Sequence, residues 1–126
     1  MQLLYQSETS GATLEEAFEL LRDNFQANKK AAPYAMEIAA GVIANKAEID
    51  ELISAHSKNW RLERMAMVDR NILRIAAFEF LKKHDDVPAS VAINEALEVA
   101  ARYSDEDAAP FINGVLDSIK NALGQD

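Results

Sequence analysis

The segment at residues 67–83 is apolar on nearly every face of a predicted helix. Val68, Ile72 and Ile75 fall three and four positions apart, which is helical spacing, and further apolar residues fill most of the remaining positions. A helix that is apolar nearly all round must be buried on most sides. A chain of 126 residues has room for one core, so we predict that this helix lies at its centre.

Amphipathic patterns flank this central segment on both sides. Their apolar residues recur at spacings of three and four, so each pattern predicts a helix with one buried face. We find no segment that reads as a strand. The sequence therefore predicts an all-α fold, a single-domain helical bundle of six or seven helices that spans residues 1–126. The amphipathic stripes lie at residues 14–25, 38–56, 93–100 and 112–123.

Capping residues and breaks set the predicted boundaries in the first half of the chain. Thr13 and Glu16 have the spacing of a capping box, in which each side chain bonds the other residue's backbone amide. The stripe over residues 38–56 skips one position, at the polar Asn45. This segment is therefore either one long helix bent near residues 41–45 or two helices that part there.

In the second half of the chain, Pro88 ends the central segment because proline disfavours helix at the residue before it. Asp107 is placed to cap the last helix. The dipeptide Asn113-Gly114 is a hairpin signal by itself, but the residues around it repeat at 3.6, so we predict helix there. Gly114 is then expected to let another helix approach closely.

Composition narrows the class of protein. Hydrophobic residues make up 49% of the chain, which is enough for a core, and there is no cysteine for a disulfide framework or a thiolate. No apolar run approaches the roughly 20 residues of a membrane helix, and no signal-peptide pattern opens the chain. We expect a soluble, cytoplasmic protein with no membrane partner.

Charge is distributed unevenly along the chain. The net charge is −8, which argues against a nucleic-acid partner, yet residues 58–83 hold seven basic and three acidic side chains, a local balance of +4. The plain explanation is that solvated charges flank a buried helix. Arg74 and Glu79 lie inside that helix, where charges are more often paired structural groups than contacts.

Sequence signatures of catalysis are absent. The chain has no phosphate-binding glycine loop, no dinucleotide fingerprint, no zinc-protease motif and no nucleophile elbow. Two histidines, no cysteine and no Glu-x-x-His pair leave no zinc or di-iron ligand set. We therefore expect no enzyme, no metal and no cofactor, and a function that lies in surfaces.

Three motifs in the second half of the chain carry a resemblance. They are Ile-Leu-Arg-Ile-Ala at 72–76, Ala-Ile-Asn-Glu-Ala at 92–96 and Phe-Ile-Asn-Gly-Val-Leu-Asp at 111–117. In this order, together with Trp60 and Arg64, they make residues 60–123 resemble the NusB family of bacterial transcription antitermination factors. The first half resembles the family in layout, with local matches at Leu4-Tyr5-Gln6 and Gly41-Val42.

The resemblance implies an all-helical fold and a function. Members of the NusB family bind the boxA element of ribosomal RNA leader transcripts together with the ribosomal protein NusE, and help RNA polymerase pass terminators in an antitermination complex. NusB proteins usually begin with an arginine-rich stretch that precedes a Leu-Tyr pair. In this chain the matching pair is Leu4-Tyr5, so Met1 lies only a few residues before it. The resemblance thus implies that the basic segment and most of the first helix are absent, with weaker RNA binding as a result. Either the start of the chain is placed too late, or this protein binds RNA poorly by itself and depends on its partner. A homodimer stays open as the oligomeric state.

Candidate contact residues follow from matching positions in the family. Tyr5, Tyr103 and Phe111 match aromatic positions near its RNA path, where a ring can stack on an unpaired base. Asp107 matches an acidic position in the loop beside that path, and Asp69 is expected on the side that faces NusE. Each has a structural alternative: Phe111 as core, Tyr5 as a helix plug and Asp107 as a cap.

Two other functions stay open. A NusB-like module reduced to protein contacts, with weak or no RNA binding, is favoured by the acidic balance and the missing arginines. A detached RNA-binding domain of a ribosomal RNA methyltransferase is also compatible with the resemblance, because the NusB fold precedes the catalytic domain in some of these enzymes. That second function requires a catalytic domain downstream of Asp126.

Overall fold

The computed structural model describes residues 1–11, 13, 16, 31–57 and 61–125. These residues form helices and contain no strand, which confirms the predicted all-α fold. The elements are α1 (Gln2–Ser10), α4 (Ala31–Ala44), α5 (Lys46–His56), the 3-10 helix η2 (Leu62–Arg64), α6 (Met67–Lys82), α7 (Ala89–Tyr103) and α8 (Ala108–Leu123).

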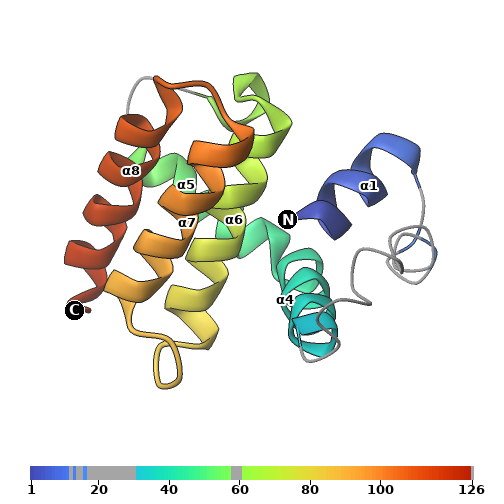
Figure 1. The fold of residues 1–126 in the computed structure, drawn as a ribbon. Coiled ribbons are helices and arrows are strands. Elements are labelled where there is room, and N and C mark those ends of the chain that lie inside the picture. Colours follow the sequence, from blue (N-terminus) through green and yellow to red (C-terminus); the bar gives the residue numbers. More distant parts are fainter. Residues whose placement is uncertain (12, 14–15, 17–30, 58–60, 126) are drawn as a thin grey trace.

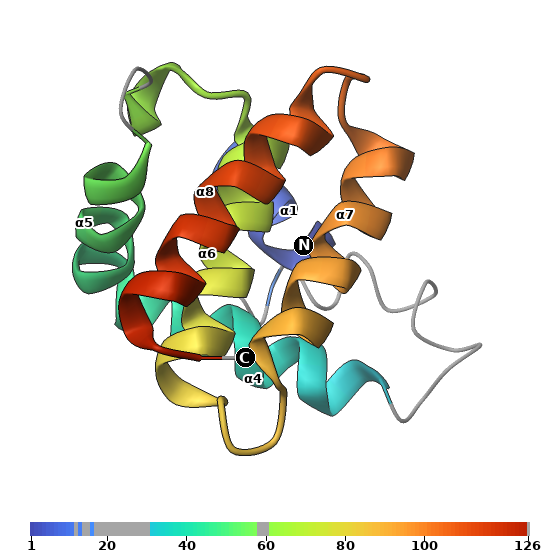
Figure 2. The ribbon, with the colours of Figure 1, turned by 90° about the vertical axis from the view of Figure 1, so that its left-hand side faces the viewer.

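Helix α6 lies at the centre of the arrangement, as its all-round apolar pattern predicts. It contacts α1, α4, α5, α7 and α8. Figures 1 and 2 show α5, α7 and α8 around α6, with α1 and α4 on a different side of it. Leu73, Ala77 and Phe80 on α6 are fully buried. Each of the other described α-helices therefore packs against α6.

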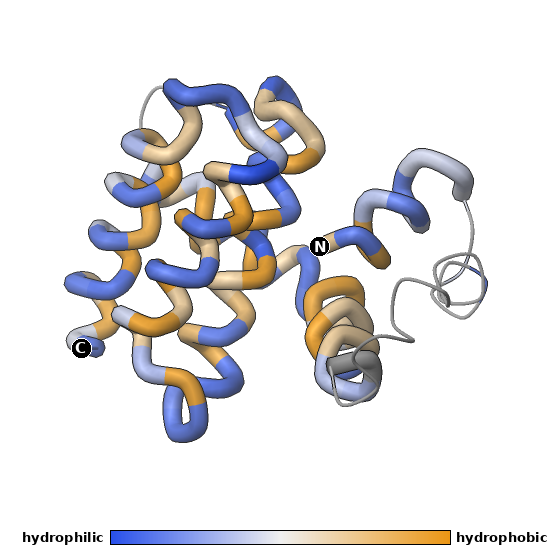
Figure 3. Tube along the Cα trace, viewed as in Figure 1, coloured by the Kyte–Doolittle hydropathy of each residue, from blue (hydrophilic) through white to orange (hydrophobic). Residues whose placement is uncertain are grey.

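The surrounding helices each present one apolar stripe to α6 or to one another. Helix α8 shows this most clearly, because Ile112, Leu116 and Ile119 are fully buried while Asn113 and Asp117 are exposed. In Figure 3 the outer side of α8 is hydrophilic and its inner side is hydrophobic. The outward side of α8 is thus a surface that no other described helix covers.

The segment around Asn45 consists of two helices, which decides between the two predicted alternatives. Helix α4 ends at Ala44 and α5 begins at Lys46. The side-chain amide of Asn45 donates to the carbonyl oxygen of Gly41 at 2.8 Å. The apolar stripe is thus interrupted at Asn45, whose polar side chain bonds to the backbone instead of packing in the core. The chain changes direction there, between α4 and α5.

Two predictions about helix ends have different outcomes. The capping box is confirmed, since the amide of Glu16 donates to Oγ1 of Thr13 at 3.2 Å and the amide of Thr13 donates to Oε1 of Glu16 at 3.3 Å. The helix predicted at residues 14–25 lies almost wholly outside the described residues. Asp107 is the residue before α8, but its side chain makes no capping hydrogen bond, so its predicted capping role is wrong.

The charges inside α6 are paired, as predicted. Arg74 is 6% exposed and donates from Nε and Nη2 to both carboxylate oxygens of Asp50, at 2.8 and 3.1 Å. Glu79 is 4% exposed and accepts a hydrogen bond of 3.0 Å from the hydroxyl of Tyr34. Burial raises the pKa of the Glu79 carboxyl, the bond from Tyr34 acts in the opposite direction, and the nearby Glu95 raises the pKa further.

Gly41 is required by the packing of α4 on α6. A Cβ added at this position would lie 2.3 Å from Cζ of Phe78, whose side chain is buried. Overpacking of a core costs about 1–3 kcal/mol, more than the roughly 0.5–1 kcal/mol that Ala gains over Gly inside a helix. We therefore expect Gly41→Ala to lower the free energy of unfolding measured with urea.

The matched control for Gly41→Ala is the same change made in a Phe78→Leu background. The smaller leucine leaves room for the added methyl group, so the change should then cost little or stabilise the fold. An equal loss of stability in both backgrounds would contradict the packing explanation.

The buried carboxyl of Glu79 should make stability depend on pH. Its folded pKa lies above the ordinary value of 4.5, so its favourable contribution is complete below that pH and is lost as pH rises through the folded pKa. Glu79→Gln cannot ionise and keeps an acceptor for Tyr34. Urea unfolding between about pH 4 and about pH 8 should therefore show the variant gaining stability over the parent as pH rises.

Glu98→Gln is the control for this series, because Glu98 is exposed on α7. It controls for the effect on stability of removing one carboxylate from the surface of the protein. A pH-independent difference for Glu79→Gln would show that Glu79 titrates alike in the folded and unfolded chains.

Candidate functional site

A depression of about 240 Å³ lies at one end of the helical bundle. Figure 1 shows that the start of α6, the end of α7 and the start of α8 all reach this end. The depression is built from η2 and the linker after it, the first turn of α6, the α7–α8 connection and the first turn of α8. Its lining residues are Arg64, Met65, Ala66, Asp69, Asp105, Asp107, Ala108 and Phe111.

Short hydrogen bonds hold the α7–α8 connection against α6. The hydroxyl of Ser104 donates to Oδ1 of Asp69 at 2.6 Å, and the amide of Ser104 donates to the carbonyl of Ala100 at 2.9 Å. The amide of Ala108 donates to the carbonyl of Asp105, also at 2.9 Å. The connection is thus fixed at both ends, which positions the acidic side chains that it carries.

The chemistry of the depression combines an apolar floor with an acidic rim. Met65 is buried, and Phe111 is half-buried and packs against the core. Asp105 and Asp107 are exposed. Carboxylates accept hydrogen bonds from N–H donors and repel phosphates, while a partly exposed ring can contact a flat apolar group. The site therefore suits a base edge or a basic side chain better than a phosphate.

Three of the five predicted contact residues meet in this depression: Asp69, Asp107 and Phe111. Tyr103 does not line it, but it is 52% exposed and directly precedes Ser104. Tyr5 lies apart on α1 and is 43% exposed. The structure thus brings together residues that are far apart in the sequence, with Tyr103 beside them and Tyr5 on another helix.

Arg64 and Asp105 line the depression as well, and the contact residues proposed from the sequence do not include them. Arg64 had two signals in the sequence, its match to the NusB pattern and its place in the basic segment. Asp105 had none beyond the acidic composition of its loop. Arg64 is exposed and forms no ion pair among the described residues, so its charge is available at the rim.

More than half of the cations in the basic segment form ion pairs with carboxylates of the same protein. Explaining its charges as solvated is therefore only partly correct. Four of its cations form ion pairs with carboxylates from other helices: Arg70 with Glu8, Arg74 with Glu8 and Asp50, Lys82 with Glu48, and Lys83 with Glu37. The local balance of +4 thus overstates the positive charge that a nucleic acid would meet.

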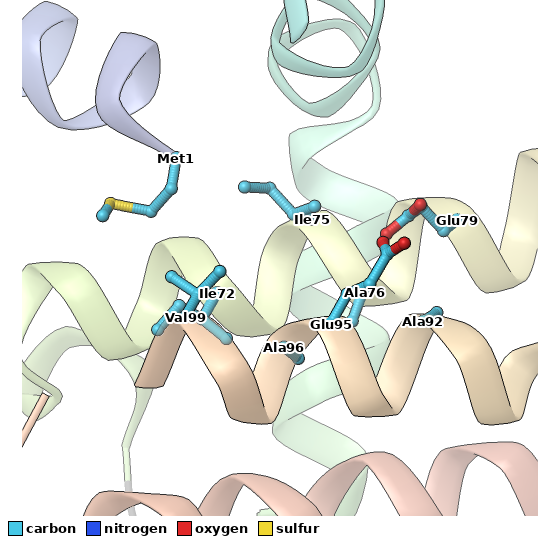
Figure 4. A pocket seen from close by; sticks show the side chains of 9 residues that line it. All are labelled: Met1, Ile72, Ile75, Ala76, Glu79, Ala92, Glu95, Ala96 and Val99. Atoms are coloured by element: carbon cyan, nitrogen blue, oxygen red, sulfur yellow. The ribbon is translucent and has the colours of Figure 1, made fainter. Parts of the chain in front are cut away.

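A second, smaller cavity of about 150 Å³ lies between α6 and α7. Figure 4 shows Met1 above it, Ile72 and Val99 at the end below Met1, and Glu79 and Glu95 together at the opposite end. Its lining is mostly apolar, with the two carboxylates as its polar groups. This arrangement can accept an apolar group that ends in a cation.

A wider hollow of about 430 Å³ lies among α5, η2 and α6. It has cations and carboxylates on its walls, including Lys46, Glu51 and Glu63, and the Arg74–Asp50 pair forms part of them. Because its charges are of both signs and partly bonded to one another, this hollow selects for neither an anion nor a cation.

The described residues include no helix that is long and apolar enough to cross a membrane. Within the same ranges, no group of three or more His, Cys, Asp or Glu side chains is arranged to hold a metal ion.

Known proteins resemble this chain in sequence over nearly its whole length. The model of the NusB family matches residues 1–121. The transcription antitermination protein NusB of Desulfotalea psychrophila is 44% identical over 126 residues, and the match covers 95% of this chain and 89% of that protein. These matches extend over the first half of the chain, where the sequence motifs are weakest.

Solved structures resemble the chain in fold as well. NusB of T. maritima superposes with a TM-score of 0.82 at 38% identity and covers 95% of this chain and 83% of its own. A structure of antitermination factors NusB and NusE in complex with dsRNA also gives a TM-score of 0.82, at 29% identity, and covers 96% of this chain and 89% of the other. The fold, the motifs and the extent of the matches lead to one conclusion: this chain belongs to the NusB family.

Proposed function

We propose that this chain is a transcription antitermination factor that binds a boxA-type ribosomal RNA leader sequence together with NusE. The complex acts on RNA polymerase, and the chain itself supplies binding surfaces. The observation that carries the proposal is the depression at the end of the bundle, where Asp69, Asp107 and Phe111 meet in a fold shared with a NusB–NusE–RNA complex.

The RNA is proposed to place unpaired bases at the depression and its backbone outside it. Phe111 and the exposed Tyr103 offer rings for stacking, and Asp107 can accept from an exocyclic amino group of a base. Arg64 at the rim and Arg102 on the last turn of α7 are exposed cations suited to phosphates. Tyr5 on α1 is a more distant member of the same proposed RNA path.

Asp69 is the proposed contact for NusE. It lies in the first turn of α6, is half-buried, and already accepts the hydroxyl of Ser104. One carboxylate oxygen thus holds the loop, and the group stays at the edge of the depression. A basic side chain of a ribosomal protein is a fitting partner for this acidic edge.

Further parts of the proposal concern organisation and location. We propose that residues 1–126 act as a single helical domain in the cytoplasm, with no catalytic step. This agrees with the central position of α6, which contacts helices from both halves of the chain.

One observation favours a second function, a protein-interaction module with little RNA binding of its own. The net charge is −8, and carboxylates outnumber cations at the depression. Such a surface repels phosphates and attracts basic proteins. The two functions differ in whether the chain binds RNA at all.

Binding of a labelled boxA-type RNA, with and without purified NusE, tests the proposed function. We expect RNA binding that becomes tighter with NusE and weaker as salt is raised, since each neutralised phosphate releases counterions. A scrambled RNA of equal length is the control. If NusE binds but boxA RNA does not, with or without NusE, the protein-interaction module is the correct function.

Tyr103→Ala tests the proposed stacking. The side chain is 52% exposed, so the fold should be unaffected, whereas loss of a base stack costs about 1–3 kcal/mol. We expect RNA affinity to fall about fivefold or more, with an unchanged melting temperature. Val91→Ala, at another exposed apolar residue of α7, should leave affinity unchanged; equal affinity for both variants would remove Tyr103 from the RNA path.

A further inference from the structure

The chain has four glycines, and the fold explains three of them. Gly11 and Gly124 end helices with positive φ angles of 71° and 67°, a conformation that side chains disfavour. Gly41 lies against the ring of Phe78 and has no room for a Cβ. Gly114 has neither reason, because its φ is not positive and a Cβ built there meets nothing within 4 Å.

Gly114 therefore weakens α8 without an internal benefit. It lies in the middle of a 16-residue helix, where glycine is less stable than alanine. The close approach of another helix that the sequence predicted is wrong, since no described residue comes near. A residue that costs stability and meets none of the described residues points to a partner outside them, one whose backbone comes closer than a methyl group allows.

The surroundings of Gly114 indicate what kind of partner this is. One turn before it lie Pro110 and Phe111, so this face of α8 continues directly from the depression. Asp107 lies two turns before it and Asp117 one turn after it, and both are exposed. Asp117 forms an ion pair of 3.5 Å with Lys120, whereas Asp107 and its acidic neighbours in the α7–α8 connection form no ion pair with any described residue.

We propose that a basic protein surface packs its backbone against α8 over Gly114, with Lys or Arg side chains reaching the exposed Asp105 and Glu106 of the α7–α8 connection. Charge selects this occupant: an RNA backbone would meet the acidic connection, and a second copy of this chain carries a net charge of −8. The inference rests on the proposed function, in which that protein is NusE, and it extends the contact from Asp69 across the depression to the outer face of α8.

Gly114→Ala gives effects of opposite sign on stability and binding. The added methyl group meets open space in the free protein, so the melting temperature should rise by about 2–5 °C. The same methyl group should keep the partner away, so affinity for purified NusE should fall about fivefold or more, and further for Gly114→Leu. Affinity for boxA RNA in the absence of NusE should not change.

Ala40→Leu is the matched control, because it adds bulk at an exposed position of α4, outside this face. It should leave NusE affinity unchanged. Equal NusE affinity for the parent and both Gly114 variants would overturn the inference and leave the proposed function intact. A loss of RNA affinity without NusE would also overturn it, because RNA would then occupy this face. If the parent chain does not bind NusE, the proposed function itself fails, and the inference with it.

Discussion

The burial of α6 on nearly all sides is the constraint on which the rest of the structure depends. The middle of a helix surrounded by five others is closed off from water, so the charged groups buried there need partners within the protein. Arg74 reaches both oxygens of Asp50 on α5, and Glu79 takes the hydroxyl of Tyr34 on α4. These bonds join helices from the two halves of the chain and fix how α4 and α5 lie against α6.

The same constraint determines where function can lie. Because the middle of α6 is enclosed, its two ends reach the surface, and the first turn does so beside the end of α7 and the start of α8. Ser104 bonds to Asp69 there and draws the acidic connection onto α6. The depression is thus a consequence of three helix ends meeting at one end of the bundle, and its chemistry is set by the residues that happen to end those helices.

Sequence periodicity predicted the helices because it records which face of each helix is apolar. It also indicated that Arg74 and Glu79 are structural, since charges inside an all-apolar helix need partners. It could not supply the partners themselves, Asp50 and Tyr34, because these come from other helices and depend on how the helices cross. For the same reason the sequence overestimated the positive charge that the basic segment presents at the surface. Its cations pair with carboxylates that are distant in the sequence.

The other predictions that were wrong concern single residues whose residue type and position are compatible with two different roles. Asp107 has the position of a cap and the side chain of a cap, yet it makes no capping bond, and its carboxylate stays at the rim of the depression. Gly114 was expected to accommodate a neighbour, and none of the described residues lies there. In both cases the residue type was interpreted as serving the fold, and in both the structure leaves the residue on the surface that the proposed partners would use.

The acidic rim and the proposed RNA site are compatible if the two partners bind together. Alone, the carboxylates at the depression oppose an RNA backbone, which limits the affinity that the aromatic rings and Arg64 can provide. A basic protein seated against the same carboxylates removes that repulsion and adds cations of its own. By linkage, RNA then strengthens the binding of the protein as much as the protein strengthens the binding of RNA. An acidic member of an RNA-binding family is therefore suited to assembling a complex in which neither partner is held firmly without the other.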